Sequence, residues 1–136
     1  MIKIENALVS LGLTEYALFG EPTNESEFNT MFKKVTGKNA DGISILSSNT
    51  SDFGVTWTQV KTEYDSLVSS EASSELRKER NNKLKDTDFY ALSDVTMSSE
   101  MTTYRQALRD LPSNYTTSDS EALATDLSNL NWPTKP

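Results

Sequence analysis

The segment between Thr56 and Lys85 constrains the fold of this chain more than any other. Thr56 and Gln59 have the spacing of a capping box, which predicts that a long helix begins here. In the second half of the segment the only sizeable apolar residues are Leu76 and Leu84, so the helix has little apolar surface to bury there. That half must therefore be solvated or held by a partner, and both leucines are candidate partner-binding residues.

The composition argues against catalysis. The chain has 136 residues, enough for one domain, but its 35% hydrophobic and 9% aromatic content predicts a thin core. It contains neither Cys nor His, which excludes metal sites built from thiolates and imidazoles and nucleophiles of the Cys or Ser-His type. Its paired carboxylates, such as Asp86 with Asp88, fall at turns or helix caps, where acidic residues have structural roles. We therefore expect no catalytic, metal-binding or cofactor-binding residues, and no cofactor.

Charge and hydropathy limit the class of partner. A net charge of −7 and a pI near 4.6 repel nucleic acid over most of the surface. The basic run from Arg77 to Lys85 is interleaved with acidic residues, so we interpret it as a solvated or partner-facing helix, with acidic phosphate or an acidic protein surface as the alternative. No apolar run approaches the roughly 20 residues that span a bilayer, and the first residues lack a secretory signal pattern. We expect a cytoplasmic protein that binds neither nucleic acid nor membrane.

Hydrophobic periodicity predicts helices and strands toward the N-terminus. Asn24 and Glu27 resemble a capping box, and the apolar residues after them predict a helix with Lys33 and Lys34 in its last turn and Gly37 at its end. Two short apolar runs predict a two-stranded sheet. The expected elements are a helix over residues 4–11, a strand over 15–20, a helix over 24–35 and a strand over 43–46.

A second well-marked helix is predicted between Ser98 or Ser99 and Pro112. Its apolar residues recur on one face, while Arg105 and Arg109 fall on the opposite side, four residues apart. The apolar stripe consists of Met101, Tyr104, Leu108 and Leu111. A further capping box at Ser118 and Glu121 predicts a short helix that continues to Leu130, and Trp132 before Pro133 predicts an extended exit.

These elements predict an α+β chain that is predominantly helical. Residues 1–55 would hold a helix and short strands, residues 56–86 the long central helix, and residues 87–136 a helical region that ends in an extended Trp-Pro tail. No internal repeat or sharp change of composition separates these regions. The chain is therefore expected to form either a single compact body or two loosely joined bodies.

The C-terminal half resembles the phage tail assembly chaperone proteins. The resemblance covers roughly residues 76–136 and rests mainly on the run Tyr104-Arg105-Gln106-Ala107-Leu108-Arg109-Asp110-Leu111-Pro112 and on Trp132-Pro133 with a terminal Pro136. Upstream, Thr87-Asp88-Phe89 and Asp94 follow in the family's order. The sequence departs from the family pattern at three places. Phe89 stands where the family usually has Trp, Met101 stands where another aromatic is common, and the connection over residues 113–130 is longer.

The resemblance implies a non-enzymatic bacteriophage protein that binds tail, tail-fibre or baseplate proteins. It would be a minor structural or adaptor component of the virion tail, or an assembly factor in the host cytoplasm, and it could form a homo-oligomer within the tail. The alternatives are a transient tail assembly chaperone absent from the virion, and a small phage-encoded enzyme or regulator of a host protein. The expected contact residues are Tyr104, Arg105, Arg109 and Trp132, although Tyr104 could equally be core and Trp132 could dock on its own helices.

Overall fold

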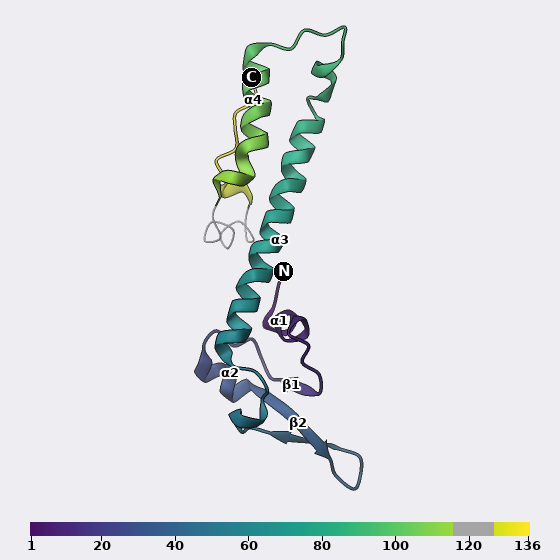
Figure 1. The fold of residues 1–136 in the computed structure, drawn as a ribbon, viewed down its shortest axis with the longest axis vertical. Coiled ribbons are helices and arrows are strands. Elements are labelled where there is room, and N and C mark those ends of the chain that lie inside the picture. Colours follow the sequence, from purple (N-terminus) through teal and green to yellow (C-terminus); the bar gives the residue numbers. More distant parts are fainter. Residues whose placement is uncertain (116–126) are drawn as a thin grey trace. The chain divides into compact units, whose positions relative to one another are not determined.

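The computed structural model describes residues 1–115 and 127–136, and it confirms a mainly helical α+β fold (Figure 1). The chain divides into two compact units, residues 1–67 and 68–136. The long helix α3 (Trp57–Lys85), expected from the capping box at Thr56, contributes residues to both units. The capping box is present, because the Thr56 backbone N–H donates to Gln59 Oε1 at 2.9 Å and the Gln59 N–H donates to Thr56 Oγ1 at 3.3 Å.

The N-terminal unit contains a small antiparallel sheet of three strands rather than the two that the sequence predicted. The strands are β1 (Tyr16–Leu18), β2 (Phe32–Lys38) and β3 (Ser44–Ser47), in the order β1-β2-β3. β2 pairs with both neighbours, with Leu18 opposite Phe32 on one side and Leu46 opposite Val35 on the other. The two strands that the sequence predicted are therefore the two edges of the sheet, and the unpredicted one is its centre.

The prediction of a helix over residues 24–35 was wrong in its second half. The helix α2 spans Glu25–Met31, and Asn24 caps it by accepting a hydrogen bond from the Glu27 N–H at 2.9 Å. The backbone turns extended at Phe32, so Lys33 and Lys34 lie on β2 instead of in a last helical turn. Pairing with strands on both sides outweighs the local helical pattern, because it satisfies the backbone of this segment in the sheet.

The core of the N-terminal unit is aromatic. Phe28, Phe32 and Phe53 are almost completely buried, and their ring centroids lie 4.8 to 6.1 Å apart. The helix α1 (Ile4–Ser10), confirmed close to its predicted bounds, adds a buried face to this core. The remaining buried members are Ile4, Ala7, Leu8 and Val60, the last from the first turns of α3.

The described part of the C-terminal unit contains the rest of α3, the helix α4 (Ser99–Asp110) and short 3-10 turns. These turns are Asp88–Ala91, Leu111–Asn114 and Leu127–Asn129. α4 begins where the sequence predicted, with the Ser98 hydroxyl accepting a hydrogen bond from the Met101 N–H at 3.1 Å. Most of the further helix predicted from Ser118 to Leu130 falls on residues 116–126, which lie outside the described residues.

Two apolar clusters hold the C-terminal unit together. Leu76 packs with Ala72, Leu111 and Leu130 in the first cluster. Leu84 packs against the second, which consists of Met101, Tyr104 and Leu108. The expectation that the second half of α3 is solvated or held by a partner was therefore wrong for its two leucines, because α4 and the end of the chain cover them. Among the described residues, no helix is long and apolar enough to cross a membrane.

Candidate partner-binding site in the C-terminal unit

Arg105 is buried at the end of α3, with only 7% of its surface exposed. Its Nη1 donates to the Leu84 carbonyl at 2.9 Å and to Thr87 Oγ1 at 2.6 Å, and its Nη2 donates to Asp88 Oδ1 at 3.0 Å. A guanidinium presents several donors in a fixed fork, so one side chain satisfies three acceptors here. Arg105 thus ties the middle of α4 to the segment where α3 ends.

The hydrogen bonds of Arg105 cap the C-terminal end of α3. The last carbonyls of a helix lack partners within the helix and carry the negative end of its dipole, so a buried cation satisfies and stabilises them. Thr87, which is completely buried, also donates to the Leu84 carbonyl, at 3.1 Å. The Asp88 side chain is 64% exposed, so its ion pair with Arg105 contributes less than the buried hydrogen bonds.

The structure corrects the expected orientation of Arg105. The sequence placed it with Arg109 on the side opposite the apolar stripe, but only Arg109 is exposed. The spacing of residues within α4 could not show that acceptors at Leu84, Thr87 and Asp88 lie beside Arg105. Arg105 is therefore occupied within its own chain and is not a candidate for contact with a partner.

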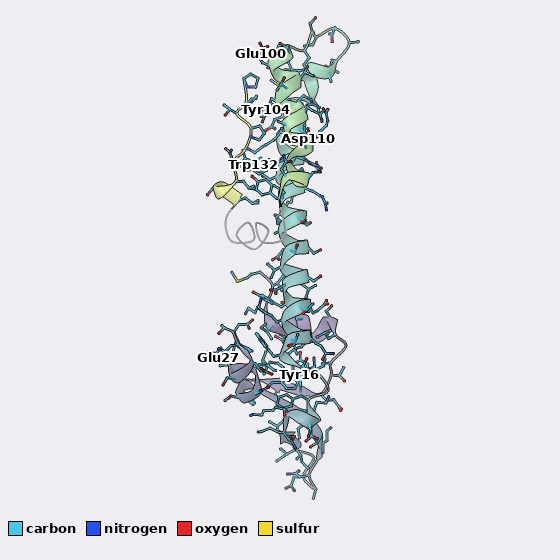
Figure 2. All side chains as sticks on the ribbon, turned by 60° about the vertical axis from the view of Figure 1, so that its left-hand side comes forward. Tyr16, Glu27, Glu100, Tyr104, Asp110 and Trp132 are labelled. Carbon is cyan, nitrogen blue, oxygen red and sulfur yellow. The ribbon has the colours of Figure 1, made fainter. Side chains whose placement is uncertain are left out.

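Trp132 docks on its own unit. Its indole Nε1–H donates to the Leu127 carbonyl at 3.1 Å, and the Lys83 Nζ lies 5.0 Å from the ring centroid in a cation–π contact. The ring is half-buried and packs against both apolar clusters of the unit. Figure 2 shows Trp132 turned from the tail toward the helices. The structure thus favours docking of Trp132 on its own helices, which the sequence left open beside contact with a partner.

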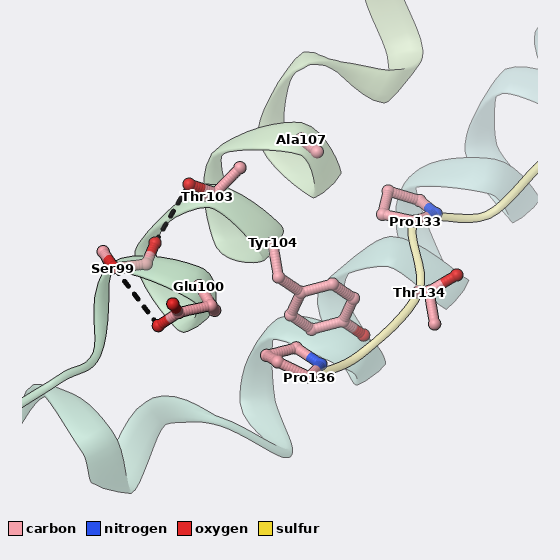
Figure 3. A pocket seen from close by; sticks show the side chains of 8 residues that line it. All are labelled: Ser99, Glu100, Thr103, Tyr104, Ala107, Pro133, Thr134 and Pro136. Atoms are coloured by element: carbon pink, nitrogen blue, oxygen red, sulfur yellow. Dashed lines mark hydrogen bonds between the residues drawn. The ribbon is translucent and has the colours of Figure 1, made fainter.

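Docking of the tail creates a groove of about 450 Å³ beside α4 (Figure 3). Its apolar wall is formed by Tyr104 and Ala107 of α4 and by Pro133 and Pro136 of the tail. Ser99, Glu100, Thr103 and Thr134 complete the lining. The Tyr104 side chain is largely buried beneath the groove, and this desolvation, with a smaller contribution from the charge of Asp86, raises the pKa of its phenol.

Glu100 is the one carboxylate among the side chains that line this groove. It lies in the first turn of α4, and backbone hydrogen bonding there, together with the Ser99 hydroxyl at 3.2 Å, lowers the pKa of its carboxyl group. Glu100 is therefore ionised at neutral pH. A groove with an apolar wall and a fixed negative charge suits a segment that brings an apolar side chain and a basic group.

Sequence reasoning missed three contributors to this arrangement: Thr87, Lys83 and Pro136. Thr87 belongs to the Thr87-Asp88-Phe89 run that supports the resemblance, so a signal for it existed, but nothing in the run showed its buried hydrogen bond. Lys83 contributes through its contact with Trp132, and Pro136, which was noted only as part of the resemblance, contributes to the wall of the groove. Such contacts between distant residues leave no mark in the spacing of one element.

Buried polar side chains are few in the described residues. Thr87 and Arg105 are the buried polar side chains in residues 1–115 and 127–136, and no carboxylate is buried there. Within the same ranges, no three carboxylates gather where they could hold a metal ion. The buried carboxylate pair that would favour a small enzyme, one of the alternatives raised by the sequence, does not occur among these residues.

Comparison with known proteins supports the resemblance seen in the sequence. Residues 73–136 match the family model described as phage tail assembly chaperone protein. No curated protein and no solved structure matches the chain. The matched residues include Arg105, Trp132, the groove beside α4 and all buried members of the two apolar clusters except Ala72.

Proposed function

Because residues 73–136 match the phage tail assembly chaperone family, we propose that the chain is a non-enzymatic tail protein that acts by binding other tail proteins. The observation that carries this proposal is the coincidence of the matched residues with one compact unit, residues 68–136. That unit has its own core and presents a groove. It acts in the host cytoplasm while tails are assembled.

The groove beside α4 is the surface that we assign to the partner. Its apolar wall would receive a side chain of the partner, and Glu100 would pair with a basic residue next to it. Trp132 contributes indirectly, because its docking holds Pro133 and Pro136 opposite Tyr104. The occupant is a segment of a tail, tail-fibre or baseplate protein that combines an apolar and a basic side chain.

The assignment of the groove is tested by co-expressing the full chain with the tail, tail-fibre and baseplate proteins of the same phage and measuring which of them co-purify. Ala107→Arg should abolish the interaction, since it fills the groove from a helical position that tolerates arginine. Ala91→Arg is the matched control, because Ala91 is exposed and does not line the groove. Equal co-purification of both variants would contradict the assignment.

Two mechanisms are compatible with this binding. Either the chain remains in the particle as a minor structural or adaptor component, or it leaves as a transient chaperone. Quantitative mass spectrometry of purified particles and of the infected-cell lysate, using peptides from Tyr104 to Pro112, separates them. A fixed copy number in particles supports the component, whereas abundance in the lysate alone supports the transient chaperone.

A further inference from the structure

The hairpin of β2 and β3 exposes apolar side chains in the N-terminal unit, outside the residues that match the tail assembly chaperone family. Ile43 is 63% exposed, Ile45 47% and Leu46 43%. Figure 1 shows the far end of this hairpin projecting from the rest of its unit. Clustered exposed apolar side chains are typical of interaction surfaces. This observation is independent of the function proposed for the C-terminal unit.

β3 is an edge strand without the usual protection. The sheet order places it at one end, with β2 on its other side. Edge strands commonly carry charged residues or proline, which prevent further strands from pairing. The four residues of β3, Ser44-Ile45-Leu46-Ser47, include neither. Its free backbone groups can therefore accept another strand.

Side-chain hydrogen bonds fix both ends of β3 despite its exposure. Asn39 Oδ1 accepts hydrogen bonds from the backbone N–H groups of Asp41 and Ile43, at 3.0 and 2.9 Å, and so organises the turn. At the other end of β3, the Ser47 hydroxyl donates to Asp52 Oδ2 at 2.6 Å. A preformed edge lowers the entropic cost of binding an extended segment.

Charge indicates the kind of segment that fits this edge. Residues 32–47 carry three lysines, Lys33, Lys34 and Lys38, and one acidic residue, Asp41. The other residues of the N-terminal unit carry two lysines and eight acidic residues. The hairpin is thus a basic element of an acidic unit. A second copy would place two positive hairpins together, whereas an acidic segment would be attracted.

We propose that the free edge of β3 binds an extended acidic segment of another protein, which adds to the sheet as a fourth strand. Backbone hydrogen bonds to β3 would provide affinity, as in other cases of strand addition. The apolar side chains of the segment, which alternate along it, would cover Ile45 on one face of the sheet. Its carboxylates would point to the other face, where they would pair with Lys38 and Lys33. The N-terminal unit would thereby hold a second partner.

The test uses a synthetic peptide of alternating glutamate and valine, titrated into the full chain labelled with nitrogen-15. The proposal predicts saturable shifts of the amide signals of residues 43–47. A peptide of alternating lysine and valine should bind at least about tenfold more weakly, because it meets the lysines of β2. A glutamate–valine peptide with methylated backbone nitrogens along one edge should lose binding, because it cannot donate the strand-pairing hydrogen bonds.

A matched pair of variants localises the binding. Ile45→Thr keeps a β-branched residue but removes apolar surface. It should weaken binding of the glutamate–valine peptide several-fold. Val9→Thr is the same type of change at a residue of α1 that is 63% exposed, and it should leave the affinity for this peptide unchanged. Absence of shifts at residues 43–47, equal binding of the methylated peptide, or a dimer of the chain alone that Ile45→Thr dissociates would each overturn the proposal.

Discussion

The hydroxyl of Thr87, which has no exposed surface, accepts a hydrogen bond of 2.6 Å from Nη1 of Arg105. The two residues are 18 positions apart, and both donate to the carbonyl of Leu84. This shared acceptor joins the end of α3 to the middle of α4. The C-terminal unit therefore depends on a polar contact within an otherwise apolar interface.

Replacing Arg105 with Met keeps an apolar stem and removes the three hydrogen bonds. We expect the free energy of unfolding of the C-terminal unit to fall by about 2–3 kcal/mol, because the Leu84 carbonyl and the buried Thr87 hydroxyl lose a charged donor. The measurement is urea unfolding followed by Trp132 fluorescence in a Trp57→Phe background. The chain has two tryptophans, so this background leaves one probe, in the C-terminal unit.

The control for Arg105 is Arg109→Met on the same helix. Arg109 is exposed, so the change should alter the free energy of unfolding by no more than about 0.5 kcal/mol. If the two variants lost the same stability, the buried contact of Arg105 with Thr87 would not be a significant support of the fold.

Trp132→Phe should destabilise the C-terminal unit less than Trp132→Ala. Phe retains an aromatic ring near Lys83 but loses the hydrogen bond to the Leu127 carbonyl, at a cost of about 1 kcal/mol. Ala also loses the packing against both apolar clusters, and since the ring is half-buried we expect a cost of about 2–3 kcal/mol. Thermal unfolding followed by circular dichroism measures the stability of both variants. Unfolding temperatures equal to that of the wild type would show that the tail does not dock in solution.

The local elements of this fold were predictable, and the non-local ones were not. The caps at Thr56 and Ser98 could be read from the sequence because each depends on residues three positions away. β2 could not, because Lys33 and Lys34 form a strand only through their pairing with β1 and β3. The pattern of residues 24–35 carried no information about those neighbours.

The same distinction applies to the candidate site. Trp132 and Tyr104 were named as contact residues from the sequence and lie at or beside the groove. The inward orientation of Arg105 was missed because its acceptors, at Leu84 and Thr87, belong to another element. The burial of Leu76 was missed for a similar reason, since the leucines that cover it lie more than thirty residues away.

The ionisation of Tyr104 should reduce stability in alkaline solution. The folded state raises the pKa of its phenol above the ordinary value of 10.0, mainly through desolvation. The folded chain therefore keeps this proton where the unfolded chain loses it, so the stabilisation is complete below pH 10 and disappears as the pH rises through the folded pKa. Phenolate absorbance of the native chain should show a late component that Tyr104→Phe removes; no difference between the two titrations would contradict the burial of this group.

Glu27 should make the N-terminal unit sensitive to acid. Its Oε2 accepts hydrogen bonds from the Thr23 N–H at 2.7 Å and from the Thr23 hydroxyl at 2.9 Å, which lower the pKa of its carboxyl group below 4.5. The resulting stabilisation is present above the unfolded pKa and is lost as the pH falls through the folded pKa. Unfolding midpoints of the wild type and of Glu27→Gln should therefore differ near neutral pH and converge in acid, whereas a constant difference would show that the charge is not involved.

The central claim is that this chain acts in tail assembly, and electron microscopy of particles from a phage that lacks it tests this most directly. We predict heads that accumulate without complete tails, and recovery of normal tails when the wild-type chain or Ala91→Arg, but not Ala107→Arg, is supplied from a plasmid. Normal tails in the absence of the chain would contradict the account.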